Sequence, residues 1–257
     1  MPVAHRSVGL RALAENRSSS ALATKALIAA VVVTILLYVV PYGHLIGYPL
    51  VLVSTIAHEM GHGIAGIFVG GRFDSFVVFA DASGSAHVAG YSGRFARAFV
   101  SAGGLCGPAC AAALGFFAAR SPRFARIAVL VLGGFLAFSL LWVVRNPFGW
   151  IAVGALAAAL LGVGLRARPQ TSQVALVFLA VQLALSVFSR GDYLFTDVAR
   201  TAQGDFPSDV ANMASALFLP YWLWGALCGA FSIAVLALGL RAYVGVIAGA
   251  SPRARRA

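Results

Sequence analysis

The segment Ile56-Ala57-His58-Glu59-Met60-Gly61-His62 decides how the rest of the chain is interpreted, and it lies inside an otherwise apolar run from Pro49 to Val69. On an α-helix, His58 and His62 lie about 40° apart around the axis and one turn apart along it, so both rings can face one metal ion. Glu59 lies about 100° from His58, close enough to contact a water on that ion without binding the ion itself. This is the His-Glu-x-x-His pattern of zinc hydrolases.

A pair of packing histidines with a glutamate partner is the alternative interpretation of this segment. The chain has 5 His in 257 residues, and its glutamates are Glu15 and Glu59. Random shuffling would produce the pattern with a probability of about one in a thousand. Uncompensated ionisable groups in a bilayer segment cost several kcal/mol and are usually functional. The pattern therefore favours one catalytic zinc per chain over a structural or vestigial metal.

The composition is that of a membrane protein. Hydrophobic residues make up 60% of the chain, charged residues 11%, and the mean hydropathy is +0.89. Such values lie outside the range of soluble domains. We expect an all-α polytopic membrane protein with about six or seven transmembrane helices, six if the two runs around Asn146 form one broken element. The apolar runs are 26–42, 48–69, 97–119, 127–144, 150–165, 174–188 and 219–240.

The charge is strongly positive, with a formal value of +11. In a soluble protein this would suggest nucleic acid, but here the arginines lie in short loops and near both ends of the chain, where lipid headgroups are the expected partner. Nucleic-acid binding is therefore excluded. The three cysteines lie in apolar runs without metal-binding spacing and are interpreted as packing residues. The distribution of Lys and Arg over seven spans does not orient the chain, so the N-terminus is only provisionally cytoplasmic.

The chain divides into three expected parts. Residues 1–23 form a basic, disordered N-terminal arm, residues 24–241 a single transmembrane domain, and residues 242–257 a basic C-terminal tail. The domain contains a hairpin segment at about 72–93 and an acid-rich loop at about 190–219. A retained first span, without a cleavable signal peptide, predicts a multi-pass integral membrane protein.

Residues 72–93 follow Gly70-Gly71, a helix stop, and combine β-branched and aromatic residues with a Ser-Gly turn. This favours a hairpin with strands near 73–80 and 85–90, although an ordinary structured loop fits equally well. An exposed strand edge at Phe76, Val77 and Val78 would bind an extended substrate segment by strand addition. His87 is interpreted as solvated.

A catalytic zinc needs a third protein ligand in addition to the two histidines. The acid-rich loop offers four aspartates, and Asp209 is favoured because it directly precedes an apolar segment and could stand at the mouth of a helix. The alternative is that Ser208 or Asp209 merely caps that helix, which is worth about 1 kcal/mol. Asp192 is the second candidate, and Asn146 is a further polar group expected near the site. The other two, Asp197 and Asp205, are interpreted as solvated.

Together these residues resemble the site-2 protease family of intramembrane zinc metalloproteases. The similarity rests on the motif His58 to His62, on Ser101-Ala102-Gly103-Gly104 with Gly107-Pro108, and on a late Ser208-Asp209 step before the element Leu219 to Gly225. It is closest to the compact bacterial branch without a PDZ domain, and this resemblance implies a place in the bacterial inner membrane. Better-studied members carry the third ligand in a Leu-Asp-Gly step, which this chain lacks.

The resemblance implies a transmembrane protein as substrate. Zinc held by His58, His62 and an aspartate would activate water, and Glu59 would act as general base. The main alternative is a zinc-binding scaffold or an inactive relative, against which Glu59 speaks. A metal transporter would need more ionisable residues on its helices. A peptidase for soluble substrates would need an extramembrane domain that the chain has no room for.

Overall fold

A computed structural model describes residues 21, 24–37, 39–189, 191–201 and 204–249. Within them, six helices are long and apolar enough to cross a membrane: α2 (Gly43–Phe68), α3 (Arg94–Ala118), α4 (Pro122–Trp142), α5 (Pro147–Arg166), α6 (Pro169–Ser189) and α8 (Tyr221–Gly249). The all-α polytopic fold is thus confirmed, and the protein is a multi-pass membrane protein. The expected N-terminal arm at 1–23 lies almost wholly outside the described residues.

The first apolar run forms a shorter helix than expected, Thr24–Leu37. At 14 described residues this helix covers about 21 Å, whereas a spanning helix needs about 20 residues. The two runs around Asn146, by contrast, form separate helices, α4 and α5, which pack side by side. The alternative of one broken element is therefore wrong.

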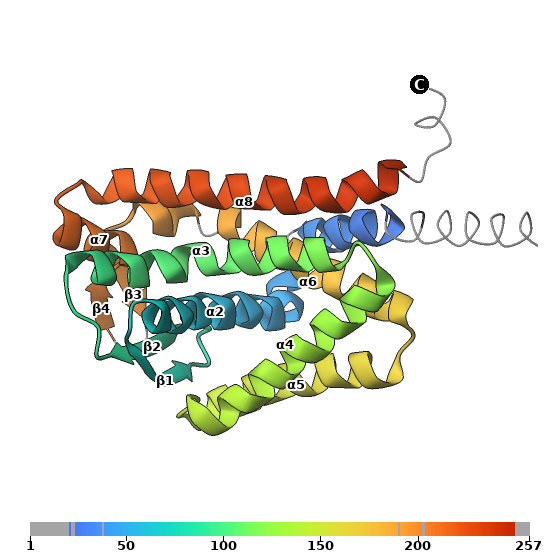
Figure 1. Cartoon of the computed structure of the whole chain (residues 1–257), viewed down its shortest axis with the longest axis horizontal. Coiled ribbons are helices and arrows are strands. Elements are labelled where there is room, and N and C mark those ends of the chain that lie inside the picture. The colour runs from blue at the N-terminus through green and yellow to red at the C-terminus, as the bar shows by residue number, and fades with distance from the viewer. Residues whose placement is uncertain (1–20, 22–23, 38, 190, 202–203, 250–257) are drawn as a thin grey trace, which may run out of the picture.

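Small elements gather at one end of the helical bundle. There lie the strands β1 (Arg72–Val78), β2 (Gly84–Ala89), β3 (Val198–Thr201) and β4 (Gly204–Pro207), together with α7 (Asp209–Leu217) (Figure 1). We call this the strand end. The opposite end holds the turn from α3 to α4, the turn from α5 to α6 and the C-terminal part of α8. We call it the arginine end, because arginines dominate its charged side chains.

The first hairpin agrees with the prediction to within two residues at each strand end. Strands β1 and β2 are antiparallel, with Phe76 opposite Ala86, and the tip is fastened to α2 by the Thr55 hydroxyl, which donates to the Ala82 carbonyl at 2.7 Å. The outer edge of β1 is not free. The Phe76 N–H donates to the Val143 carbonyl at 2.7 Å, and the Phe76 carbonyl accepts from the Arg145 N–H at 3.1 Å. The expectation of an exposed edge at 76–78 is therefore wrong.

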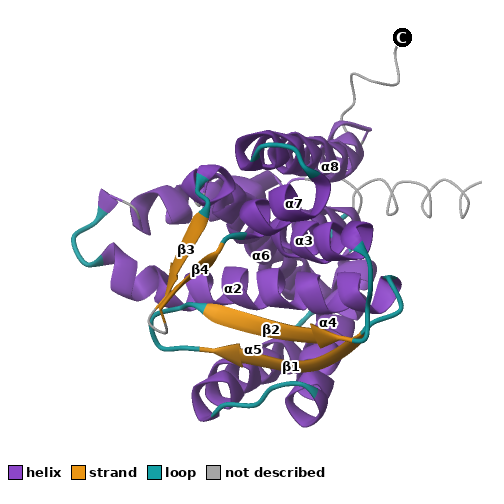
Figure 2. Cartoon of the chain, turned by 90° about the vertical axis from the view of Figure 1, so that its left-hand side faces the viewer, coloured by secondary structure: helices purple, strands orange, loops and turns teal. Residues whose placement is uncertain are grey.

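The acid-rich loop is more structured than the sequence indicated. It contains a short 3-10 helix, η1 (Gly191–Phe195), the second hairpin β3–β4, and then α7. Figure 2 looks onto the strand end and shows the two hairpins as separate ribbons beside α2. The β3–β4 hairpin was not predicted, because its strands have only four residues each and no apolar alternation. It leads directly into Ser208 and Asp209.

Candidate metal centre

The two histidines of α2 converge as their spacing requires. The Nε2 atoms of His58 and His62 lie 3.2 Å apart. The His62 Nδ1 lies 2.8 Å from the Val100 carbonyl oxygen on α3. Because a carbonyl can only accept, the His62 proton sits on Nδ1, which leaves the Nε2 lone pair available to a metal. Helix α3 thus fixes both the orientation and the tautomer of one ring.

Helix α3 approaches α2 closely because small residues face each other. A Cβ on Gly61 would lie 2.2 Å from the Gly103 carbonyl oxygen, and one on Gly107 would lie 2.8 Å from the Ala57 carbonyl oxygen. The His62 ring occupies the space in front of Gly104, where a Cβ would lie 2.2 Å from Nε2. Backbones that approach this closely are typical of small-residue interfaces between membrane helices. The glycines therefore make room for the metal-facing ring.

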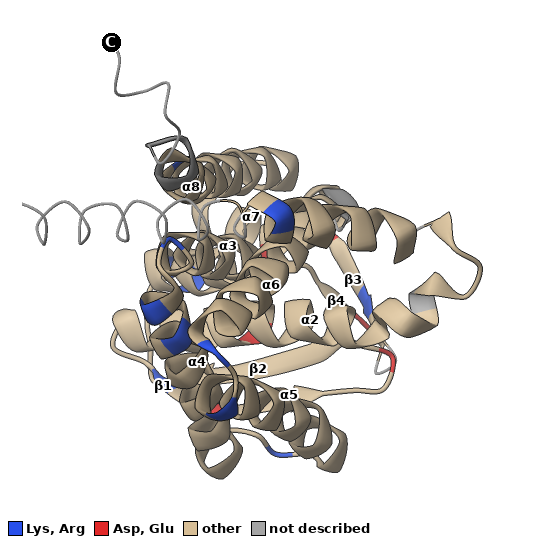
Figure 3. Ribbon diagram, turned by 90° about the vertical axis from the view of Figure 1, so that its right-hand side faces the viewer, with Lys and Arg blue, Asp and Glu red and all other residues tan. Residues whose placement is uncertain are grey.

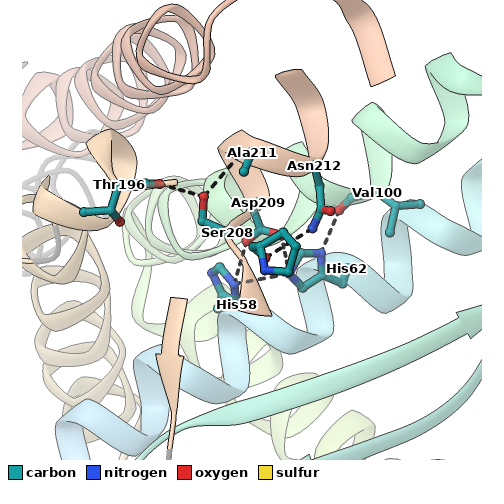
Figure 4. Close-up of polar contacts among 9 residues, drawn as sticks. His58, His62, Val100, Thr196, Ser208, Asp209, Ala211 and Asn212 are labelled. Carbon is teal, nitrogen blue, oxygen red and sulfur yellow. Dashed lines mark hydrogen bonds and ion pairs between the residues drawn. The ribbon is translucent and has the colours of Figure 1, made fainter. Parts of the chain in front are cut away.

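Asp209 is the first residue of α7 and reaches the same point. Its Oδ2 lies 3.1 Å from His58 Nε2, and its Oδ1 lies 3.4 Å from His62 Nε2 (Figure 4). Its side chain is only 9% exposed. Burial alone would raise the pKa of Asp209, yet the two neighbouring histidines outweigh it, so the pKa lies well below its usual range. The carboxylate is therefore ionised at neutral pH.

Ser208 holds the start of α7 in place. Its hydroxyl donates to the Thr196 carbonyl at 2.6 Å and accepts from the Ala211 N–H at 3.2 Å, and its own N–H donates to the Asp197 carbonyl at 2.9 Å. Ser208 is therefore the N-cap, and Asp209 is left to face the histidines (Figure 4). The sequence left open whether this Ser-Asp step caps the helix or supplies the third ligand. In the structure Ser208 caps the helix, and Asp209 lies beside the histidines.

The other end of α7 is held by Arg94, which the sequence analysis did not single out. Its Nε donates to the Ala216 carbonyl at 2.5 Å, and its guanidinium lies 3.5 Å from the centre of the Phe218 ring. Phe218 ends the helix in the left-handed conformation, with φ 65°. Because Arg94 begins α3, the same helix positions His62 through Val100 and the Asp209 helix through Arg94.

The donor set fits zinc. Nitrogen and oxygen ligands about 2.0–2.2 Å from one tetrahedral ion lie about 3.3–3.5 Å from each other, and the three separations at this site are 3.1, 3.2 and 3.4 Å. When Nε2 of both imidazoles is unprotonated, as metal binding requires, these two nitrogens and the carboxylate oxygens all offer lone pairs to an ion. Asp209 Oδ2 is buried, and its contact in the described structure is the ion pair with His58 Nε2, with no further hydrogen bond. His58, His62 and Asp209 also form the one group of His, Cys, Asp and Glu side chains in the described chain that could hold a metal ion.

Glu59 lies beside this group and is buried, with 6% of its surface exposed. Its side chain packs against the start of β2, where a Cβ on Gly84 would lie 2.8 Å from Glu59 Cγ and 3.1 Å from Oε1. The absence of a side chain at Gly84 therefore leaves room for the carboxylate. The general-base candidate and the first hairpin are in direct contact.

The remaining predicted site residues lie elsewhere. Asn146 donates to the Val78 carbonyl at 2.6 Å and accepts from the Val78 N–H at 3.2 Å, so it binds the hairpin backbone. Phe76 and Val78 are fully buried, and Val77 is half-buried. Asp192 lies in η1, and its side chain is outside the described part of the structure.

Tyr193 was missed by the sequence analysis. Its ring meets His58 edge to face, with centroids 5.9 Å apart. A tyrosine in an irregular segment carries no spacing pattern that would have indicated this contact.

Comparison with known proteins gives one result at the level of the family. The family model described as Peptidase M50B-like matches residues 27–239. No curated protein and no solved structure matches the chain significantly. The match covers all three candidate ligands and Glu59, and most of the chain. The chain belongs to the Peptidase M50B-like family, which is part of the site-2 protease group that the sequence resembles.

Proposed function

We propose that this member of the Peptidase M50B-like family is an intramembrane zinc metalloprotease that hydrolyses a peptide bond in or near a transmembrane segment of another protein. The observation that carries the proposal is the convergence of His58, His62 and Asp209 on one point, with Glu59 beside them. Peptidases with a His-Glu-x-x-His helix use this combination for hydrolysis. We place the protein in the bacterial inner membrane.

In the proposed reaction, three residues bind the metal and a fourth transfers the proton. His58, His62 and Asp209 would hold the zinc, which when bound supplies a Lewis acid that activates water and polarises a carbonyl. Glu59 takes a proton from the attacking water while the water oxygen forms a bond to the scissile carbonyl carbon. When the C–N bond breaks, Glu59 gives that proton to the leaving amine nitrogen. Burial of Glu59 keeps bulk water from competing for the proton.

The substrate segment must be extended where it is cut, because a helix hides its carbonyls in hydrogen bonds. The outer edge of β1 is occupied by 143–145, whereas no described strand pairs with the other edge of β2. Since Gly84 of β2 contacts Glu59, a segment paired along β2 would pass the general base. We therefore assign substrate binding to β2 rather than to Phe76, Val77 and Val78.

The test compares wild type with Glu59→Gln in bacterial membranes. Mass spectrometry of labelled new N-termini should find fragments of membrane proteins that wild type produces and Glu59→Gln does not. Elemental analysis of both purified proteins should give about one zinc per chain. Equal zinc contents with no fragment that depends on Glu59 would overturn the protease and favour a zinc-binding scaffold. If purified wild type contains no zinc, both the metalloprotease and the zinc-binding scaffold are overturned.

A further inference from the structure

The two histidines of the metal centre are held in different ways. The His62 ring is oriented through Nδ1, which lies 2.8 Å from the Val100 carbonyl oxygen. The described polar contacts of His58 all use Nε2, which lies 3.2 Å from His62 Nε2 and 3.1 Å from Asp209 Oδ2. An imidazole that binds a metal needs groups around it that fix the ring. In the described part of the chain, packing of the His58 ring has to serve this purpose.

Charged side chains are scarce on the helices that surround this ring. Seen from the arginine end, Figure 3 shows α2 and α8 in tan over almost all of their length. Besides its histidines, α2 has one charged residue, Glu59, and α8 has one, Arg241. Arg241 lies 16 positions after Gly225, about 24 Å along the helix axis. An ion pair from α8 therefore does not orient His58.

The ring of Tyr193 meets the His58 ring instead. The two ring centroids lie 5.9 Å apart, and the ring planes meet at 77°. The His58 ring also meets the His62 ring, with centroids 4.8 Å apart and an angle of 84°. Edge-to-face contacts at these separations are a favoured geometry for aromatic rings. A rotation of the His58 side chain would break both contacts.

Helix α8 fixes Tyr193 through the next residue. A Cβ on Gly225 would lie 1.8 Å from the Leu194 carbonyl oxygen, so η1 rests directly on the α8 backbone. Tyr193 and Leu194 also pack against a buried cluster that includes Val210 and Met213 of α7. The Tyr193 ring is therefore held by the helix that begins with Asp209 as well as by α8.

We propose that Tyr193 is a positioning residue that orients the His58 imidazole toward the metal, and that Gly225 acts through it by letting η1 lie against α8. The chain between α6 and α7 then serves the metal centre twice. It presents Asp209 as a ligand, and it places a ring against a second ligand. The inference rests on the proposed function, because it assigns a role at the same metal centre.

The first test replaces the ring. Tyr193→Leu should lower zinc affinity about 3- to 10-fold, the range expected for one aromatic contact. Competition with a chelator measures the affinity. The visible spectrum of the Co²⁺-substituted protein, whose bands report the ligand geometry, should change as well. Tyr193→Phe keeps the ring and should restore both the affinity and the spectrum.

A control separates orientation of His58 from general loss of packing. Tyr243 is fully buried and meets the Phe116 ring at 6.0 Å, in a different buried cluster from the one that Tyr193 contacts. Tyr243→Leu should lower the unfolding temperature in detergent and leave zinc affinity and the Co²⁺ spectrum as in wild type. Each variant should elute from a sizing column in detergent as one peak, as wild type does.

The second test moves η1 without changing Tyr193. Gly225→Ala should lower zinc affinity about as much as Tyr193→Leu, since the new methyl group would overlap the Leu194 carbonyl. Gly229→Ala is the matched control one turn later on α8, where a Cβ would lie 3.5 Å from Leu194 Cδ1, an ordinary contact. If Gly225 acts through Tyr193, the double variant should lose no more affinity than the weaker-binding single variant.

The outcomes separate this inference from the proposed function. Wild-type affinity in Tyr193→Leu, or a loss in Tyr193→Phe as large as in Tyr193→Leu, would overturn the role of the ring while the metal centre stands. Additive losses in the double variant would overturn the role of Gly225. If Tyr193→Leu does not elute as one peak, equal affinities of Gly225→Ala and Gly229→Ala would overturn the proposal. A wild type that binds no zinc would overturn the proposed function together with this inference.

Discussion

Helices α2 and α3 cross backbone against backbone, whereas α4 and α5 pack through side chains. At the first crossing Gly61 and Gly107 face main-chain atoms, and Gly103 faces Ala65 Cβ and the Gly61 carbonyl. At the second, a Cβ on Gly133 would meet the Leu161 side chain at 2.9 Å, and one on Gly164 would meet the Leu130 side chain at 2.5 Å. Leucine side chains can change rotamer, but a backbone cannot retreat without moving its helix. The comparison shows where this membrane protein is rigid: at the helices that hold the ligands.

Among the predicted changes, removal of a metal ligand should reduce zinc binding the most. Asp209→Ala and His58→Ala should each lose nearly all bound zinc, since a tetrahedral site cannot close with two protein ligands. Elemental analysis of purified protein measures this directly. Asp192→Ala is the matched control and should keep about one zinc per chain. Loss of zinc in Asp192→Ala, with retention in Asp209→Ala, would reassign the third ligand.

Gly104→Ala should have the next largest effect. The new methyl group would overlap the His62 ring, which cannot turn away without breaking its hydrogen bond to Val100. Changes that misorient a metal ligand typically cost about 10–100-fold in affinity. Zinc affinity is measured by competition with a chelator. Gly134→Ala on α4 is the control, because nothing lies within 4 Å of the added methyl group. Equal affinities for the two variants would refute the role assigned to Gly104.

Ser208→Ala should have a moderate effect. It removes the cap of α7 and the bond to Thr196, which is worth about 1 kcal/mol, and it loosens the position of Asp209. We expect zinc affinity to fall about 5-fold, since 1 kcal/mol corresponds to roughly that factor. Ser215→Ala is the control on the same helix: the Ser215 hydroxyl donates to the Asn212 carbonyl within α7, and its loss should leave the affinity unchanged. A larger loss in Ser215→Ala than in Ser208→Ala would contradict the capping argument.

Gly164→Ala, at the α4–α5 contact, should have the smallest effect on zinc binding and on stability. It tests whether this contact tolerates an added methyl group better than the α2–α3 crossing does. The methyl group would press on Leu130, which can adopt another rotamer, so we expect a loss of no more than about 1 kcal/mol. Thermal unfolding in detergent measures the loss, and the zinc content should match wild type. Zinc loss comparable to that of Gly104→Ala would mean that α4–α5 packing also controls the metal centre.

Much of the fold could be predicted from the sequence, because apolar runs and the positions of Gly-Gly and Pro are local patterns. The first hairpin was predicted for the same reason. The second was not, since β3 and β4 are short and polar. The loss of the free β1 edge depends on Val143–Arg145, which is distant in sequence, and no local pattern reports such a pairing.

In the metal centre, too, local sequence patterns predict some residues, whereas contacts between distant segments could not be predicted. The spacing of His58, Glu59 and His62 predicts their shared helix face. Asp209 could be favoured over three other aspartates only by its place before an apolar segment, and the structure puts it beside the histidines. Val100 and Arg94 could not be predicted at all. A backbone carbonyl has no sequence signature, and an arginine at a helix start is usually solvated.

The order of the ligands along the chain has a consequence for biosynthesis. Two ligands lie on α2, but the third emerges from the ribosome only after four more spanning helices have been made. At about 5–20 residues per second, the nascent chain spends on the order of ten seconds with an incomplete metal centre. If the chain hydrolyses peptide bonds as proposed, it gains that activity only after Asp209 has been made and α7 has folded. Fragments released before residue 209 would be unable to cut the membrane proteins assembling around them.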